Sequence, residues 1–293
     1  MATPIGNLND LSFRASAVLS QVSLVAAEDT RHSRTLLAHI GTDARLIAAH
    51  THNERASADQ VIRALRDGER CALISDAGTP GISDPGARLV NTVREAGFRV
   101  IPVPGASAPV CLLSVAGIDA GRYGEAADQF YFGGFLPAKE SARSVALRAL
   151  PADRACNVIF ESPHRIHATA SSLLSVFGPD RDLVIGRELT KKFEQIALLT
   201  TNEFPSWLNA DANHARGEFV LVIAPPRRNT SHGETEALNA STNIDIQMPA
   251  GQLVAHLQHY LSASQASKLA KKLTGLDQSA LYKLAVANKD RDA

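Results

Sequence analysis

Short, fully apolar runs alternate with amphipathic segments through the first 118 residues, and this alternation limits the fold more than any other feature of the sequence. The runs at 24–27, 71–74 and 100–103 have the length and continuous apolar character of strands that are buried on both faces. Helical periodicity predicts helices over 12–20, 31–39, 56–67, 85–96 and 107–116. This alternation indicates an α/β domain over 1–118, built on a mainly parallel, doubly wound sheet.

A second α/β domain is expected over 119–225. Strands are predicted from about 130 and over 157–160, 182–187, 193–200 and 218–224, and helices over 139–149 and 163–176. Because several of these strands follow one another without a helix between them, we expect a mixed sheet.

The last part of the chain changes in composition. Residues 226–249 are rich in Pro, Asn, Ser and Thr, which predicts a flexible linker. Three amphipathic segments near 250–260, 263–273 and 277–287 then predict a small three-helix module over 250–293, similar to a helix-turn-helix unit.

Composition excludes several classes of protein. The chain has no apolar run of about 18 residues, and its first residues lack the basic-then-apolar pattern of a secretory signal, so we expect a cytoplasmic protein without a membrane span. Cys71, Cys111 and Cys156 are scattered, which argues against a disulfide scaffold or a zinc ribbon. The 30 Lys and Arg residues balance 30 Asp and Glu residues, so nucleic-acid binding would need a local basic patch. Residues 250–289 offer one, with five lysines and one aspartate.

The stretch SDAGTPGISDPG, residues 75–86, follows the strand at 71–74, at the edge where open α/β sheets bind ligands. Its three glycines allow the backbone to approach a ligand closely. Asp84 and Pro85 are interpreted as the N-cap and first residue of the next helix, with Gly97 as its stop. Asp76 caps no helix in this interpretation and is the better candidate for a ligand contact.

Two more glycine-bearing loops are expected at the same edge. They are TPIGNLND at 3–10 and PVPGASA at 102–108, where Ser107 either caps the following helix or contacts a ligand. Neither G-x-G-x-x-G nor G-x-x-x-x-G-K-[ST] occurs in these loops. The pattern therefore favours a nucleoside-like cofactor without a polyphosphate.

Charged clusters follow three predicted strands. EDTRH at 28–32 contains Asp29 and Thr30, either of which would also serve as a helix cap, and ESPHR at 161–165 places Ser162 as a cap and Pro163 as the first helical residue. RELTKKFE at 187–194, taken alone, is typical of a solvated charge run. The histidines at positions 32, 50 and 52 lack carboxylate or thiolate partners at ligand spacing, so no metal site is predicted.

Eight motifs occur together and in a fixed order: TPIGNL, EDTRH, SDAGTPGISDPG, PGASA, FGGFLP, ESPHR, RELTKKFE and GEFVLVI. With them the chain, from residue 2 to about 224, resembles the bacterial ribosomal small-subunit methyltransferase I family, a branch of the two-domain tetrapyrrole-methylase (class III methyltransferase) fold. The C-terminal helices look like that family's helical domain. The resemblance implies S-adenosylmethionine as methyl donor and a homodimer. It also implies, as acceptor, the ribose 2′-hydroxyl of a decoding-site cytidine (cytidine 1402 in rRNA numbering) in the 16S rRNA of the small ribosomal subunit.

The resemblance also implies roles for individual residues. Cofactor contacts are expected from Leu8, Asp76, Ala77, Gly78, Thr79, Ile82, Ser83, Ser107 and Ala108. The second domain would cover the cofactor with residues near Leu136, Glu161 and Glu218.

Asp29 and Lys191 are the candidates for handling the hydroxyl proton, with Lys191 either a neutral base or a cation that stabilises an alkoxide. Arg31, Arg165 and Arg187 would bind flanking phosphates, and the lysine-rich tail would dock on the RNA.

One departure from the family pattern concerns the N-terminus. The family has an apolar strand before TPIGNL, whereas here only Met1 and Ala2 precede it. We expect that strand to be central, so its loss would expose ladder groups. A start codon set too far downstream is the preferred explanation, and a chain weakened in stability and cofactor binding is the other.

Two alternative functions remain open at this point. One is a methylase of tetrapyrroles or of a protein side chain on the same fold. The other is a catalytically impaired RNA-binding assembly factor.

Overall fold

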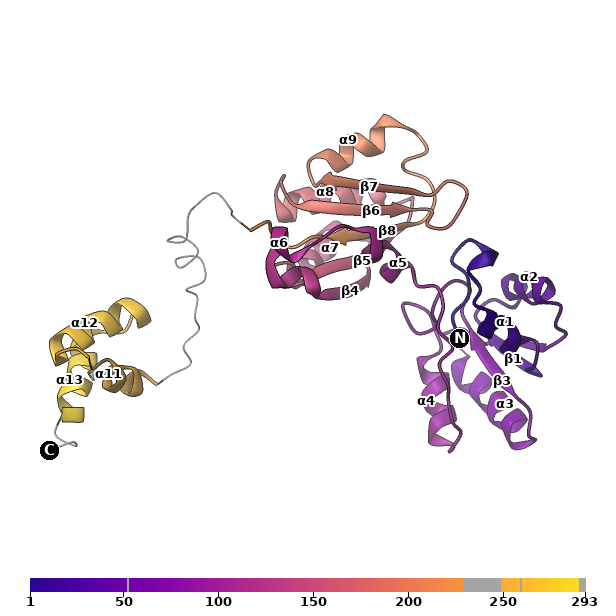
Figure 1. Ribbon diagram of the computed structural model, residues 1–293, viewed down its shortest axis with the longest axis horizontal. Helices are drawn as coiled ribbons and strands as arrows, with labels where there is room; N and C mark the ends of the chain where they lie inside the picture. Colours follow the sequence, from indigo (N-terminus) through magenta and orange to yellow (C-terminus); the bar gives the residue numbers. More distant parts are fainter. Residues whose placement is uncertain (52, 229–248, 259, 290–293) are drawn as a thin grey trace. The chain divides into compact units, whose positions relative to one another are not determined.

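A computed structural model describes residues 1–51, 53–228, 249–258 and 260–289 of the chain (Figure 1). The chain divides into two compact units, Met1–Arg228 and Asn229–Ala293. The described residues form two sheets in the first unit and three helices in the second. Within the described residues, no helix combines the length and apolar character needed to cross a membrane.

The first sheet has three parallel strands in the order β2-β1-β3, namely Arg45–Ala48, Leu24–Ala27 and Cys71–Ile74. Successive residues of β1 point to opposite sides of the sheet, and all four are apolar and buried, so helices cover both faces. Leu24 and Ala26 pack against α3 (Glu54–Arg66) and α4 (Ala87–Glu95), and Val25 and Ala27 pack against α1 (Phe13–Leu19) and α2 (Thr30–Ile40). The predicted parallel sheet with helices on both faces is confirmed.

Two strand predictions in this part of the chain need correction. Strand β2 was not predicted; its apolar residues Leu46, Ile47 and Ala48 follow the exposed Arg45, and only Ile47 of the strand is buried. The strand expected at 100–103 does not form. Pro102 and Pro104 have no N–H to donate to a ladder. The Met1 amino group donates to Leu73 O (2.9 Å) and Ala2 N donates to Val103 O (3.1 Å), so the first two residues lie between β3 and this segment.

The second sheet has five strands in the order β4-β5-β8-β6-β7. Their bounds are Phe130–Phe135, Cys156–Glu161, Phe219–Ile223, Asp182–Arg187 and Gln195–Thr200. β4 and β5 are parallel, and the other neighbouring pairs are antiparallel, so the predicted mixed sheet is confirmed.

Helices cover both faces of the second sheet as well. Ile159, Ile185 and Leu221 face the helices α7, α8 and α9, which span Glu140–Ala149, Ile166–Phe177 and Glu203–Ala210. Their neighbours in the strands point the other way, toward α5 (Ala108–Val115), whose Leu112 is fully buried. Thus α5, which follows a loop at the edge of the first sheet, packs on the second sheet. Short helices at Leu8–Asp10, Ala120–Tyr123 and Gly124–Asp128 complete the unit.

The C-terminal unit contains α11 (Ala250–Gln258), α12 (Ala263–Thr274) and α13 (Gln278–Lys289). They bury a small core that contains Leu253, Val254, Ala270, Leu281 and Ala285. Ser262 and Gln265 form a capping box at the start of α12, and Gly275 ends that helix in the left-handed conformation. The three predicted helices are therefore present. Of the predicted linker at 226–249, residues 229–248 lie outside the described residues.

Candidate functional site

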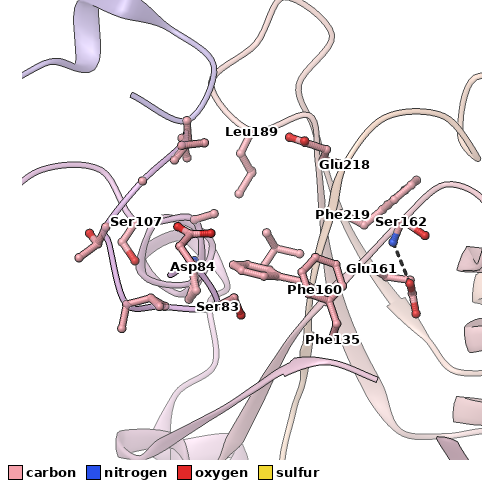
Figure 2. Close-up of a pocket in the computed structure, with 18 of the residues that line it drawn as sticks. Ser83, Asp84, Ser107, Phe135, Phe160, Glu161, Ser162, Leu189, Glu218 and Phe219 are labelled. Atoms are coloured by element: carbon pink, nitrogen blue, oxygen red, sulfur yellow. Dashed lines mark hydrogen bonds between the residues drawn. The ribbon is translucent and has the colours of Figure 1, made fainter. Parts of the chain in front are cut away.

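A cavity of about 360 Å³ lies where the loops of the first sheet meet the second sheet (Figure 2). One side consists of the loop after β3 and the loop before α5, and it includes seven residues predicted from the sequence: Ala77, Gly78, Thr79, Ile82, Ser83, Ser107 and Ala108. The opposite side comes from the second sheet and its loops, and its side chains include Phe135, Phe160, Glu161, Leu189, Lys191 and Glu218. Two residues predicted to contact the cofactor, Leu8 and Asp76, are not part of the lining.

Hydrogen bonds from backbone and side chain join the three glycine-bearing loops on one side of the cavity. Thr3 N donates to Gly78 O (2.9 Å) and Gly78 N donates to Thr3 O (3.1 Å), while Thr79 Oγ1 donates to Ala106 O (3.1 Å). Gly78 has φ +81°, and a Cβ there would lie 3.3 Å from Ile5 Cγ2. A glycine is therefore required for both the turn and the close packing.

Helix α4 is capped by a residue that the sequence analysis did not identify. The helix begins at Ala87, and the buried Glu54 from α3 accepts hydrogen bonds through Oε2 from the backbone N–H groups of Gly86 (3.3 Å), Arg88 (3.0 Å) and Leu89 (3.2 Å). A carboxylate at this position satisfies N–H groups that have no partner within the helix and favours the helix dipole. The interpretation of Asp84 and Pro85 as the N-cap and first residue is therefore wrong, whereas Gly97, with φ +89°, does follow the helix end as predicted.

Asp84 instead lines the cavity, directly after Ser83, whose φ of +69° is unusual for a residue other than glycine. Burial and the negative charge of Glu28 raise the pKa of Asp84 to about 6. Burial and the charge of Asp76 also raise the pKa of Glu28. Asp76 itself accepts a hydrogen bond from Asp29 N (2.9 Å). Three acidic side chains therefore influence one another at this edge of the first sheet.

Asp29 lies outside the cavity lining and caps α2, as one of the two sequence interpretations expected. Its Oδ1 accepts from Arg31 N (2.8 Å), and its carboxylate pairs with the Arg31 guanidinium (2.9 Å). The hydrogen bonds from Arg31 lower the pKa of Asp29 to about 2. This low pKa makes Asp29 a weak proton acceptor, while the exposed Arg31 is accessible to solvent.

Lys191 does line the cavity, held in place by two carboxylates. Its Nζ donates to Glu188 Oε1 (2.9 Å) and to Glu218 Oε2 (2.8 Å). Burial alone would lower the pKa of Lys191, but the hydrogen bonds to Glu218 and Glu188 outweigh that effect and raise it. Lys191 is therefore a cation at neutral pH, which favours the second of its two proposed roles.

The backbone around Lys191 is closely packed and strained. Glu188 (φ +52°) and Thr190 (φ +65°) adopt the left-handed region, and Thr190 N donates to Glu194 Oε2 (2.6 Å). A Cβ on Gly6 would overlap the stem of Lys191, so the first loop of the chain lies directly against this side chain. Strained residues of this kind cluster at functional sites.

The remaining two arginines predicted to bind phosphate are engaged within the protein. Arg187 is buried and donates to Arg216 O (2.6 Å), Phe193 O (3.1 Å) and Gln195 Oε1 (2.9 Å), so the structure contradicts its role as a phosphate ligand. Arg165 donates to both oxygens of Glu161 (2.9 and 3.1 Å), which leaves it only partly accessible.

Arg165 also occupies the N-cap position of α8, which begins at Ile166. The expectation that Ser162 caps this helix and Pro163 starts it is therefore wrong.

No group of three or more His, Cys, Asp or Glu side chains that could hold a metal ion occurs within the described residues. Of the three histidines considered above, the one at position 52 lies outside them.

Comparison with known proteins gives consistent matches along the chain. A family model for "Tetrapyrrole (Corrin/Porphyrin) Methylases" matches residues 2–205. The ribosomal RNA small subunit methyltransferase I of Escherichia coli O157:H7 is 41% identical over 284 residues, covering 97% of this chain and 92% of that protein. The protein of the same name from Xylella fastidiosa (strain Temecula1) is 42% identical over 282 residues, covering 96% of each.

Two solved structures share the fold of the first unit. Uroporphyrin-III-C-methyltransferase from Thermus thermophilus has a TM-score of 0.55 and 21% identity, covering 76% of this chain and 91% of that chain. A diphthine synthase has a TM-score of 0.55 and 12% identity, covering 75% of this chain and 87% of that chain. At this level of identity the likeness concerns the fold alone.

Proposed function

Because this chain belongs to the ribosomal RNA small subunit methyltransferase I family, within the tetrapyrrole methylases, we propose that it methylates the ribose 2′-oxygen of a decoding-site cytidine, cytidine 1402, in 16S rRNA. The chain is a methyltransferase with the tetrapyrrole-methylase fold, as expected from its motifs, and S-adenosylmethionine is its methyl donor. When bound, the donor supplies an electrophilic methyl group on a positively charged sulfur. The acceptor, its position in the rRNA, a homodimer and a cytoplasmic location are parts of the proposal.

The observation that carries the proposal is the cavity between the two sheets. Its volume of about 360 Å³ lies within the usual range for sites that bind small molecules. Residues Ala77 to Thr79 line one side, where Gly78 packs closely against Ile5, and Phe135 and Phe160 line the other side. Backbone turns opposite aromatic rings suit a nucleoside that carries a sulfonium group.

Lys191 supplies the electrostatic part of the chemistry in this proposal. A ribose hydroxyl is a weak acid, and negative charge develops on its oxygen as the proton leaves. A fixed cation beside the cavity stabilises that charge. Glu188 and Glu218 keep Lys191 protonated and oriented, so it acts as a charge and not as a base.

RNA contacts are proposed for two exposed basic regions. Arg31 lies at the start of α2 in the first unit. The C-terminal unit presents Lys268, Lys271 and Lys272 on α12 and Lys283 on α13, all of them exposed. Cations of this kind bind phosphates without reading the base sequence, so they would position the RNA.

The test is methyl transfer to defined acceptors. Purified full-length chain is incubated with radiolabelled S-adenosylmethionine and one of three substrates: small ribosomal subunits lacking the modification, naked 16S rRNA, or uroporphyrinogen. We expect label in the rRNA of the assembled subunits, and mass mapping should locate it to the ribose of one decoding-site cytidine. Label on a base, on another nucleotide or only on the porphyrin would contradict the proposal.

A further inference from the structure

Asp84 has no role in capping a helix or in the methyl transfer proposed above. It does not cap α4, because Glu54 does. It lines the cavity, and Figure 2 shows its carboxylate directed into the space between the loop after β3 and Phe160. A half-buried carboxylate that stabilises no helix end suggests a task connected with the ligand.

The surroundings of Asp84 lack a balancing positive charge. The nearest charged groups on its own side, Glu28 after β1 and Asp76 after β3, are both acidic, and the hydroxyl of Ser75 is its hydrogen-bonding neighbour. No salt bridge involves Asp84 within the described part of the chain.

The charged groups across the cavity are already paired. Glu161 on β5 binds Arg165, and Lys191 is shared between Glu188 and Glu218. A partly desolvated carboxylate beside two other acids is unfavourable unless a cation arrives.

We propose that Asp84 is the counter-charge for the sulfonium group of S-adenosylmethionine, so that the cavity binds the charged donor in preference to the uncharged product, S-adenosylhomocysteine. This inference rests on the donor assigned above and adds a specific residue to it. The two ligands share the adenosine, the carboxylate and the ammonium group, and they differ in the methyl group and the charge on sulfur. Any selectivity that depends on the charge of Asp84 must therefore act at the sulfur.

Methyl transfer removes this attraction. The bond from the methyl carbon to the acceptor oxygen forms as the carbon–sulfur bond breaks. The electron pair of the broken bond stays on sulfur, which becomes neutral, and the proton of the acceptor hydroxyl is released to solvent water. Asp84 then holds the product less tightly than it held the donor. Because the carboxylate favours the charged ground state, its loss should raise KM for the donor without lowering kcat.

The protonation of Asp84 makes the proposal testable without any substitution. Above its raised pKa of about 6 the side chain is ionised and attracts the sulfonium. Below that pH the Asp84 carboxylate of the free enzyme is protonated. Binding of the donor must then displace this proton, so the affinity for the donor falls. An α-amino group has a pKa of about 7.7–8.0, so both ligands keep their ammonium charge between about pH 5 and 7.

The experiment is isothermal titration calorimetry of the full-length chain with S-adenosylmethionine and with S-adenosylhomocysteine, at several pH values between about 5 and 7. In the wild type we expect the ratio of donor to product affinity to fall about 10-fold from pH 7 to pH 5. In Asp84→Asn the ratio of donor to product affinity at pH 7 should be about 10- to 100-fold lower than in the wild type and should not vary with pH. This range corresponds to a sulfonium that lowers the pKa of Asp84 by about one to two units, since each unit is a tenfold change in affinity. Asp59→Asn, an exposed position on α3, is the matched control and should behave as the wild type.

The outcomes that overturn the inference are distinct. A wild-type ratio that does not change with pH overturns it even if Asp84→Asn fails to fold. Equal losses of affinity for both ligands in Asp84→Asn also overturn it, because the carboxylate would then act on a group that the two share. If the wild type binds neither ligand at about pH 7, where Asp84 is ionised, the donor assignment itself fails, and the inference with it.

Discussion

The charge state of each acidic or basic side chain near the cavity depends on a small number of neighbours. Lys191 stays protonated because Glu188 and Glu218 accept its hydrogen bonds, and Asp29 stays ionised because Arg31 donates to it. Asp84 has acidic neighbours and a pKa of about 6. Single substitutions at these positions should therefore separate binding of the donor from the transfer step.

Lys191→Met tests the electrostatic role. Methionine keeps an unbranched apolar stem against Gly6 but removes the charge, so we expect kcat to fall about 10²- to 10³-fold, as when one oxyanion donor is removed. Steady-state methylation of small subunits at saturating donor measures kcat, and calorimetry measures donor affinity, which should change much less. The neighbouring exposed Lys192→Met is the control and should retain wild-type kcat. Equal kcat in the two variants would remove Lys191 from the chemistry.

Gly6→Ala tests whether the first loop positions Lys191. The added Cβ would overlap the lysine stem and lie 3.2 Å from Leu189 O, and φ at Gly6 is not positive, so the effect is steric. We expect a loss of about 1–3 kcal/mol in the free energy of unfolding and a reduced kcat. Gly251→Ala on α11, with no atom within 4 Å of the new Cβ, should instead stabilise the chain slightly. Urea unfolding measures stability, and an unchanged kcat in Gly6→Ala would contradict the positioning role.

At the scale of helices and strands, long-range contacts decide where elements begin and end. Helix α4 starts where Glu54, more than 30 residues earlier in the chain, reaches its free N–H groups. Helix α5 follows the first sheet in sequence but packs through Leu112 on the second. In both cases a contact that is distant in sequence orders a loop beside the cavity.

Glu54→Gln measures the strength of the α4 cap. The amide keeps the shape of the side chain but loses the charge that faces three N–H groups at the start of the helix. We therefore expect the free energy of unfolding to fall by about 1–3 kcal/mol. Glu95→Gln at the other end of α4, where an acid opposes the helix dipole, should have little effect or a small stabilising one. Urea denaturation of both variants gives the comparison, and equal effects would show that the cap contributes nothing.

Sequence patterns predicted correctly those helices and strands that are determined by residues within the element itself. The predicted runs at 24–27 and 71–74 match β1 and β3 residue for residue because each is apolar throughout. The cap predicted at Asp84 failed because local preference cannot reveal a carboxylate supplied by another helix. The expected strand at 100–103 failed because a strand requires a partner with backbone groups in register, which an apolar run does not provide.

The residues of the candidate site also differ in whether local sequence could predict them. The turn residue Gly78 was predicted at the cavity because it follows β3, and open α/β sheets bind ligands beyond the carboxyl ends of their strands. Phe135 and Phe160 on the facing wall come from a different sheet, and only the fold brings them to the cavity. Arg187 looked available for RNA in the sequence, but its three donations inside the protein became visible only in the structure.

At the scale of the whole molecule, the chain separates the proposed methyl-transfer site from a basic helical module. The cavity is lined entirely by residues of the first unit, and the second unit has its own core around Leu253 and Val254. This division predicts that donor binding and RNA affinity respond to different substitutions.

Replacing four exposed lysines among the described residues of the C-terminal unit, namely Lys268, Lys271, Lys272 and Lys283, by glutamine tests that division. Removing one lysine–phosphate interaction should reduce the slope of log K against log salt concentration by about 0.7–0.9, so the slope should fall by about 3–3.6 if all four lysines contribute. Filter binding of a decoding-site rRNA fragment at several salt concentrations measures the slope, and calorimetry should show unchanged affinity for S-adenosylmethionine. The charge-matched control replaces four exposed arginines of the first unit, Arg63, Arg66, Arg94 and Arg99, by glutamine. If both quadruple variants lower the slope equally, the effect reflects net charge, and the C-terminal unit is not the docking surface.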